Sequence, residues 1–229
     1  MTLVEDYGLD SPPRKLLLLV LSIDDCNFQK AMDKLHIQKV IRFFEHLRKK
    51  SEVDFSNFKL GGVSYELEEN RDALIEYELI EPINGRFVLT NEGYDAAKAL
   101  KQSLDKTEIE QLVFAKQLLN DLPSDELLYF MYKTIPETQK YSTEFSRLER
   151  KKDMLVKNLF LKRKIDVATA SSWLGISQSD FVKKLRKKPL SAENQKALIE
   201  GYQQGADEDL VIAKDFEQVD KELDEECDT

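Results

Sequence analysis

Apolar residues recur at helical spacing through the first half of the chain. A repeat of three or four positions predicts an amphipathic helix over 36–50, carried by Ile37, Val40, Ile41, Phe44 and Leu47. Before it, Ser11-Pro12-Pro13 supplies a cap and first-turn prolines, so a helix is expected from Arg14 to Ser22. A third helix over 64–77 is predicted after Gly61-Gly62. The pattern favours a mainly α fold.

Two short strand-like runs follow these helices. Apolar residues at 79–83 and 86–89 flank Asn84-Gly85, which suits the tight turn of a β-hairpin because both residue types tolerate positive φ. Thr90 can then cap a closing helix over about 94–104. Three helices, a short β-hairpin and a closing helix are the plan of a winged helix-turn-helix domain.

Several short motifs in this region resemble a known family. The motifs are Gly62-Val63-Ser64-Tyr65-Glu66-Leu67, Leu74 to Glu81, Phe87 to Gly93, Leu122 to Tyr129 and Ile135-Pro136-Glu137. They are similar to passages of prokaryotic winged-helix proteins and of Panacea-type domains, which neutralise toxins. The resemblance covers roughly residues 14–145 and implies a winged-helix fold with a regulatory role.

The third helix of a winged-helix domain normally enters the DNA groove, but here it is acidic. Arg71 stands against Glu66, Glu68, Glu69, Asp72, Glu76 and Glu78. Phosphates would be repelled, because DNA affinity depends on Lys and Arg that displace counterions. We therefore expect this domain to bind protein or a second copy of itself.

A second helix-turn-helix is predicted further along the chain. A short helix over 167–174 ends at Gly175, where the turn requires positive φ. Ser177 can cap the next helix, over 178–187, which stops before Pro189. Its exposed polar side chains suit phosphates and base edges. The candidate DNA-binding residues are Gln178, Ser179, Lys183, Lys184, Arg186 and Lys187.

The run from Ile165 to Ser177, followed by Phe181-Val182-Lys183-Lys184-Leu185, resembles the helix-turn-helix of small prokaryotic antitoxins. The resemblance implies that the second helix contacts DNA. A helical hairpin with a purely structural role is the alternative, because a helix-turn-helix fold does not by itself mean DNA binding. Trp173 is interpreted as a core anchor rather than a base-stacking platform.

Charge is distributed unevenly along the chain. Residues 147–188 carry a formal charge of +9, residues 193–229 carry −10, and residues 1–146 carry −8. A basic block beside an acidic tail favours a nucleic-acid binder with a protein-binding or self-masking extension. The alternative interpretation of the basic block is a solvated helix face.

An apolar stripe runs along the acidic tail. The residues predicted to bind a partner are Tyr202, Leu210, Ala213, Phe216 and Val219. Leu198 to Gln204 and Asp209 to Glu217 resemble the toxin-binding tails of CopG-like and MazE-like antitoxins, which implies a helix laid into a groove on a toxin-like partner. The alternative is a tail that folds back over the basic block of the same chain or of a dimer mate.

No familiar enzyme motif occurs in the chain, which lacks phosphate-binding glycine patterns, H-E-x-x-H and G-x-S-x-G. Two Cys and two His without ligand spacing predict neither a metal site nor a cofactor. The apolar run Leu16 to Leu21 is too short to cross a membrane, and the acidic start does not fit an export signal. We expect a cytoplasmic protein that is not an enzyme.

The leading hypothesis is an antitoxin-like, DNA-binding transcriptional regulator. We expect a winged helix-turn-helix domain over 1–104, a helical extension over 105–146, a basic helix-turn-helix over 147–190 that binds double-stranded DNA, and an acidic amphipathic tail over 191–229 that binds a protein partner. A homodimer is expected, because one helix-turn-helix covers little DNA. The alternative is a non-enzymatic adaptor that dimerises through its helical domains without binding DNA.

Overall fold

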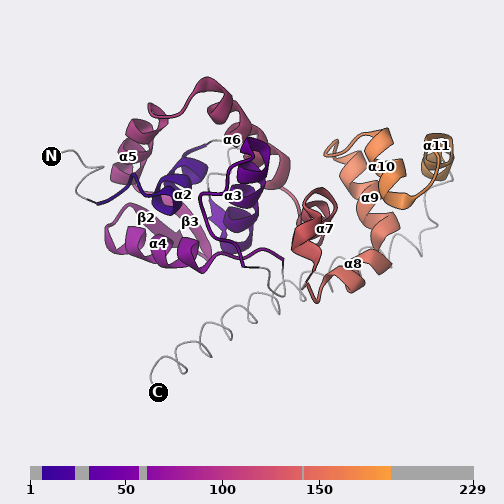
Figure 1. The fold of residues 1–229 in the computed structure, drawn as a ribbon, viewed down its shortest axis with the longest axis horizontal. Helices are drawn as coiled ribbons and strands as arrows, with labels where there is room; N and C mark the ends of the chain where they lie inside the picture. The colour runs from indigo at the N-terminus through magenta and orange to yellow at the C-terminus, as the bar shows by residue number, and fades with distance from the viewer. Residues whose placement is uncertain (1–6, 24–30, 57–60, 141, 187–229) are drawn as a thin grey trace, which may run out of the picture. The chain divides into compact units, whose positions relative to one another are not determined.

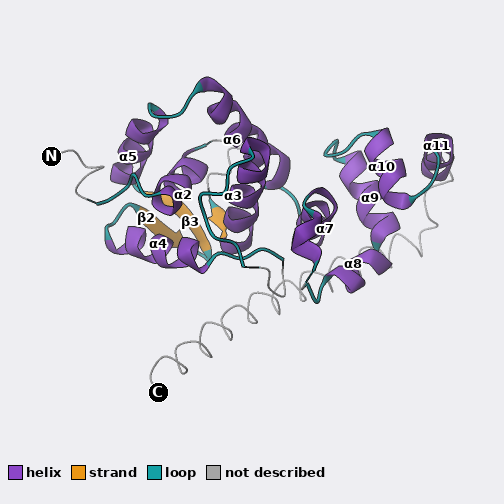
Figure 2. Ribbon diagram, viewed as in Figure 1, coloured by secondary structure: helices purple, strands orange, loops and turns teal. Residues whose placement is uncertain are grey.

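The computed structural model describes residues 7–23, 31–56, 61–140 and 142–186 (Figure 1). The described chain forms two compact units, of which the first ends at Gly175 and the second begins at Ile176. Helices dominate, and the first unit also holds a small antiparallel sheet (Figure 2), which confirms the mainly α expectation.

The second unit contributes α11 (Gln178–Arg186). In chain order, the elements of the first unit are α2 (Pro12–Ser22), β1 (Met32–Asp33), α3 (Lys34–Arg48), α4 (Tyr65–Glu76), β2 (Ile80–Ile83), β3 (Arg86–Leu89), α5 (Asn91–Lys101), α6 (Lys106–Leu119), α7 (Ser124–Thr134), the 3-10 helix η1 (Pro136–Gln139), α8 (Phe145–Arg150), α9 (Lys152–Leu161) and α10 (Val167–Leu174).

Helix α2 lies at the centre of the first unit. It begins directly after Ser11, with both prolines in its first turn, two residues earlier than predicted. Each residue from Leu16 to Leu21 is at most 2% exposed, because α3, α4, α5 and β3 pack around this helix. A helix that is apolar on all sides is buried in this way. The apolar run is therefore the core of the fold.

The sheet has the strand order β1-β3-β2, and both pairings are antiparallel. Asn84 and Gly85 join β2 to β3 with φ of 51° and 73°, as the tight-turn prediction requires. Pro82 is tolerated because β2 is an edge strand. A residue without an N–H can face solvent there, so no acceptor on a neighbouring strand loses its hydrogen bond. The predicted hairpin is confirmed, whereas β1 was not predicted from the sequence.

Capping side chains set where the neighbouring helices begin. The Asp33 carboxylate accepts the backbone N–H of His36 at 2.9 Å, so α3 begins two residues before the predicted start. Ser64 Oγ accepts the N–H of Leu67 at 3.2 Å and starts α4 close to its predicted position. Lys49 adopts φ of 54° and ends α3 at Arg48.

The last helices of the first unit form a hairpin that packs on α7. Arg163, with φ of 58°, closes α9, and its backbone N–H bonds to the carbonyl of Phe160 at 2.9 Å. Asp166 caps α10 by accepting the N–H of Thr169 at 2.7 Å, and Gly175 ends the helix with φ of 68°. The predicted helix and its left-handed glycine are both present.

None of the helices in the described part of the chain is long and apolar enough to cross a bilayer.

Candidate functional site

Most of the candidate DNA-binding residues lie on α11. Gln178, Ser179, Lys183 and Lys184 are exposed, whereas Phe181 on the same helix is only 1% exposed. Helix α11 is therefore amphipathic, with polar and cationic side chains open to solvent. Of the two remaining candidates, Arg186 is the last residue of α11, and Lys187 lies outside the described residues.

One acidic side chain shares the first turn of α11 with these groups. Ser177 Oγ accepts the backbone N–H of Asp180 at 3.1 Å and donates to its carboxylate at 2.7 Å, which confirms the predicted cap. The Asp180 carboxylate also lies 3.4 Å from Lys183 Nζ. The hydrogen bond from Ser177 and the charge of Lys183 hold the pKa of Asp180 below its ordinary value. An Asp at a helix N-terminus stabilises the helix dipole.

The apolar residues predicted to face inward in the helix-turn-helix are mostly protected from solvent. Ala170 and Phe181 are buried, and Leu174, Ile176 and Leu185 are half-buried. Trp173 is also half-buried, and its ring meets those of Tyr129 and Phe130 nearly edge-on at 6.1 and 5.9 Å. The tryptophan packs within the first unit, in agreement with its interpretation as a core anchor.

Many cations of the basic block are held in ion pairs within the first unit. Arg147 lies 2.5 Å from an oxygen of Asp125 and 2.7 Å from one of Glu144. Burial alone would raise the pKa of Asp125, but the hydrogen bond and charge of Arg147 outweigh this effect and hold the pKa below its usual value. Further pairs are Lys151–Asp125, Lys152–Glu149, Lys162–Glu126 and Lys164–Asp121.

These ion pairs reduce the positive charge that the basic block, residues 147–188, presents to a ligand. Asp121, Asp125, Glu126 and Glu144 precede residue 147, so carboxylates outside the block compensate a large part of its charge of +9. Charge that is already paired releases few counterions from DNA. On α11, Lys183 and Lys184 are exposed, and the one pairing shown for them here, between Lys183 and Asp180, stays within the helix.

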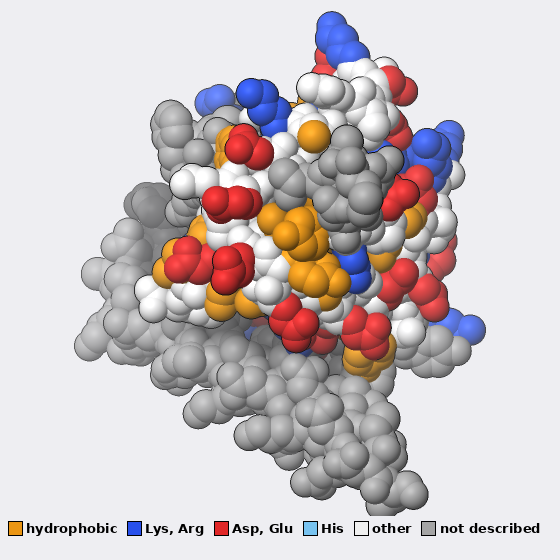
Figure 3. All heavy atoms as spheres, turned by 90° about the vertical axis from the view of Figure 1, so that its left-hand side faces the viewer, with side chains coloured by type: hydrophobic (Ala, Val, Ile, Leu, Met, Phe, Trp, Pro, Cys, Tyr) orange, Lys and Arg blue, Asp and Glu red, His pale blue; other side chains and the backbone are white. Residues whose placement is uncertain are grey.

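The surface of α4 is acidic, as the sequence predicted. Glu66, Glu69, Asp72 and Glu76 are exposed. Arg71 offers little positive charge to a ligand, because its guanidinium lies 4.8 Å from the centre of the Phe87 ring and 2.7 Å from Asp72. Figure 3 looks onto the side of α4 and α5 and shows Asp and Glu side chains around a small apolar area. This side repels phosphate.

Two buried basic residues of α3 have structural partners. His36 Nδ1 lies 2.7 Å from the Asp33 carboxylate, and Nε2 lies 2.8 Å from the Leu122 carbonyl oxygen. Lys39 Nζ donates to the Gly62 carbonyl at 2.9 Å. Within the described ranges, no group of three or more His, Cys, Asp or Glu is placed to hold a metal ion.

A cavity of about 700 Å³ in the first unit is the feature that motif analysis missed. It is lined by aromatic side chains that are far apart in the sequence, so no short motif could have indicated it. Its residues are distinct from the candidate DNA-binding residues of α11.

The predicted partner-binding residues of the tail, Tyr202, Leu210, Ala213, Phe216 and Val219, lie outside the described residues. Comparison with protein-family models, curated proteins and solved structures finds no match for this chain. Function therefore has to be inferred from the residues and their geometry.

Proposed function

We propose that the protein is a cytoplasmic, antitoxin-like transcriptional regulator in which α11 binds double-stranded DNA. The exposed polar and cationic residues of α11, preceded by the capped helix α10 and the left-handed turn at Gly175, carry this proposal. Lys183, Lys184, Arg186 and Lys187 would bind phosphates. Gln178 and Ser179 are at the start of the helix, where recognition helices contact base edges.

We also propose that residues 1–104 form a winged helix-turn-helix domain. Two features support it: the element order α2-β1-α3-α4-β2-β3, and a sheet in which β3 pairs with both β1 and β2. The β2–β3 hairpin would then be the wing. Because α4 is acidic, this domain would contact a protein or a second copy of the chain, and the regulator would act as a homodimer.

The acidic tail would bind a toxin-like protein partner. Its charge of −10 and its apolar stripe support this part of the proposal, since an acidic amphipathic helix fits a groove on a basic protein.

A salt titration of DNA binding tests the role of α11. Fluorescence anisotropy of a labelled duplex is measured with the full chain, the double variant Lys183→Ala/Lys184→Ala, and the charge-matched control Lys98→Ala/Lys106→Ala. We expect the control to bind like the wild type, and the α11 variant to bind more weakly with a salt slope lower by about 2, roughly one per phosphate contact. Absence of DNA binding at low salt, or an equal loss of DNA affinity in both double variants, would refute the proposal that α11 binds DNA.

An adaptor that does not bind DNA is the second candidate. Two observations favour it: the paired cations of residues 147–164 and the acidic surface of α4. Both leave less positive surface for phosphate than the sequence indicated. The adaptor predicts a dimer in analytical ultracentrifugation that shows no salt-sensitive binding to duplex DNA.

A further inference from the structure

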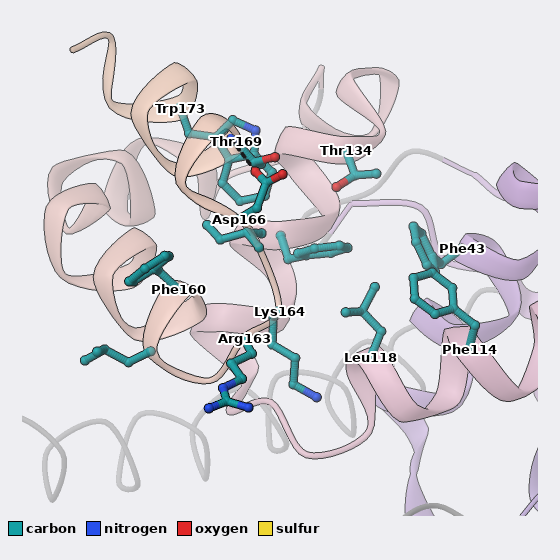
Figure 4. Close-up of a pocket in the computed structure, with 13 residues that line it drawn as sticks. Phe43, Phe114, Leu118, Thr134, Phe160, Arg163, Lys164, Asp166, Thr169 and Trp173 are labelled. Carbon is teal, nitrogen blue, oxygen red and sulfur yellow. Dashed lines mark hydrogen bonds between the residues drawn. The ribbon is translucent and has the colours of Figure 1, made fainter. Parts of the chain in front are cut away.

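The cavity of about 700 Å³ is open to solvent and lies between α3, α6, α7, α9 and α10 (Figure 4). Small-molecule sites in proteins have volumes of roughly 300 to 1,000 Å³ and mainly apolar walls. Most of this wall is apolar, and its apolar side chains include Phe43, Phe114, Leu118, Phe130, Phe160 and Trp173.

Aromatic rings from four helices form a continuous chain beside the cavity. The ring centre of Phe43 lies 6.4 Å from that of Phe114 and 5.6 Å from that of Phe130, and Phe130 lies 5.9 Å from Trp173. In Figure 4, Phe43 and Phe114 stand on one side of the cavity, and Phe160 and Trp173 on the other. An apolar ligand between them would exchange water for ring surface on both sides.

Large apolar side chains at this cavity remain exposed. Phe114 is 51% exposed and Leu161 is 61% exposed, although both line the cavity. Covering such side chains is favourable because it removes apolar surface from water. The site therefore favours an occupant with an apolar body.

The charged groups of the wall indicate the polar part of the occupant. Lys164 lies 2.6 Å from Asp121, and Asp166 is occupied in capping α10. Arg163 is exposed and forms no ion pair within the described ranges. Figure 4 shows Arg163 and Lys164 at one end of the cavity, away from Asp166, Thr169 and Trp173. This end can accept an anion.

We propose that the cavity binds a small hydrophobic carboxylate. Its aromatic or aliphatic body packs against the rings of Phe43, Phe130 and Trp173, and its carboxylate binds the Arg163 guanidinium. A planar guanidinium binds a carboxylate through two parallel hydrogen bonds, which a neutral amide does not reproduce. The proposal does not depend on DNA binding by α11.

Trp173 makes the test direct, because it is the one tryptophan of the chain and lines the cavity. Tryptophan emission of the full-length protein is titrated with octanoate and with 4-phenylbutyrate, each beside its neutral amide, and calorimetry supplies independent affinities. We expect each carboxylate that binds to bind about tenfold more tightly than its amide. The stronger of the two carboxylates identifies an aliphatic or an aromatic ligand.

Two matched variants separate recognition from folding. Arg163→Asn removes the charge while keeping a residue type that tolerates positive φ, so the preference for carboxylate over amide should fall to about 1. Arg150→Asn makes the same charge change at an exposed residue of α8 outside the cavity lining, and should keep the preference. Leu161→Glu adds a negative charge at an exposed position and should weaken binding of the carboxylate more than that of the amide.

Three results would overturn the proposal. Equal affinities for carboxylate and amide in the wild type would exclude recognition of an anion. No change in emission and no heat up to millimolar ligand would exclude a small-molecule site. A wild-type dimer that Leu161→Glu converts to monomer would show instead that the cavity mouth is a contact between copies of the chain.

Discussion

Gly93 of α5 lies too close to the backbone of Leu79, the residue before β2, for any side chain. A Cβ added at this residue would stand 2.0 Å from the carbonyl oxygen of Leu79. We expect Gly93→Ala to lower the free energy of unfolding by roughly 2 to 4 kcal/mol, because backbone has to move. Chemical denaturation measures the change.

Gly62→Ala is the matched control, since its Cβ would meet Phe55 at an ordinary distance of 3.6 Å. Its effect should stay within about 1 kcal/mol. Similar losses in the two variants would mean that the approach of Leu79 to Gly93 is not the cause.

His36 stabilises the fold in its protonated form. Burial disfavours the imidazolium, but the hydrogen bond and charge of Asp33 outweigh burial and the repulsion of Arg86, and they raise the pKa of His36 above 6.5. This contribution is complete below pH 6.5 and is lost as the pH rises through the folded-state pKa. Thermal melts of wild type and His36→Gln from pH 5.5 to 8.5 should therefore converge as the pH rises. A constant difference would mean that His36 does not titrate in this range.

Lys39 has the opposite pH dependence. Burial, assisted by the charge of Arg42, lowers its pKa from 10.5 to about 7. Between these values the unfolded chain binds the proton and the folded chain does not, so stability increases with pH by up to about 1.4 kcal/mol for each pH unit.

Lys39→Met tests this dependence. Its free energy of unfolding should lack the rise that the wild type shows from pH 7 to 9, measured by urea denaturation at each pH. Parallel curves for the two proteins would show that Lys39 stays protonated in the fold.

The carboxyl end of α2 is satisfied by lysine side chains. Lys116 is completely buried and donates to the carbonyl oxygens of Val20, at 3.1 Å, and of Ile23, while Lys101 donates to that of Ser22 at 3.3 Å. Cations at a helix C-terminus complement its dipole, and buried carbonyls need partners.

We expect Lys116→Met to destabilise the protein by about 2 to 3 kcal/mol, because it leaves buried carbonyls without their donor. The exposed Lys98 of α5 gives a control, since Lys98→Met should change stability by less than about 0.5 kcal/mol. Both values come from denaturant titration. An unchanged midpoint for Lys116→Met would show that water replaces the lysine.

The charges of the whole chain predict competition between DNA and the tail. Residues 193–229 carry −10 and the basic block carries +9, so the tail is expected to screen the block from phosphate. A chain that ends at Leu190 should bind duplex DNA more tightly than the full chain, most clearly at low salt. Equal affinities would mean that the tail does not mask the block.

Local signals account for what the sequence predicted well. The Asn84-Gly85 turn, the cap at Ser177 and the left-handed Gly175 each depend on one or two residues and their immediate neighbours. The exposed face of α11 follows from the spacing of its polar residues. The observed ends of α3 differ from the predicted ends by two residues, because Asp33 and Lys49 cap this helix.

Contacts between distant residues account for what it could not predict. Strand β1 has two residues and no alternation of its own, and it exists because Met32 and Asp33 pair with Phe87 and Arg86. The ion pairs of the basic block could not be predicted from its charge, because their carboxylates, such as Asp125 and Glu126, lie on another helix.

The sequence by itself determined helices α2, α3, α4, α5, α10 and α11, the hairpin and the polar face of α11, because periodicity, caps and turn residues act over a few positions. Tertiary structure alone decided which cations are compensated, how the three strands join and where a cavity opens. Phe43 and Trp173, for example, line one cavity although most of the chain's first unit separates them in sequence. Only tertiary packing brings such side chains together, and therefore no pattern along the chain predicts that they line the same cavity.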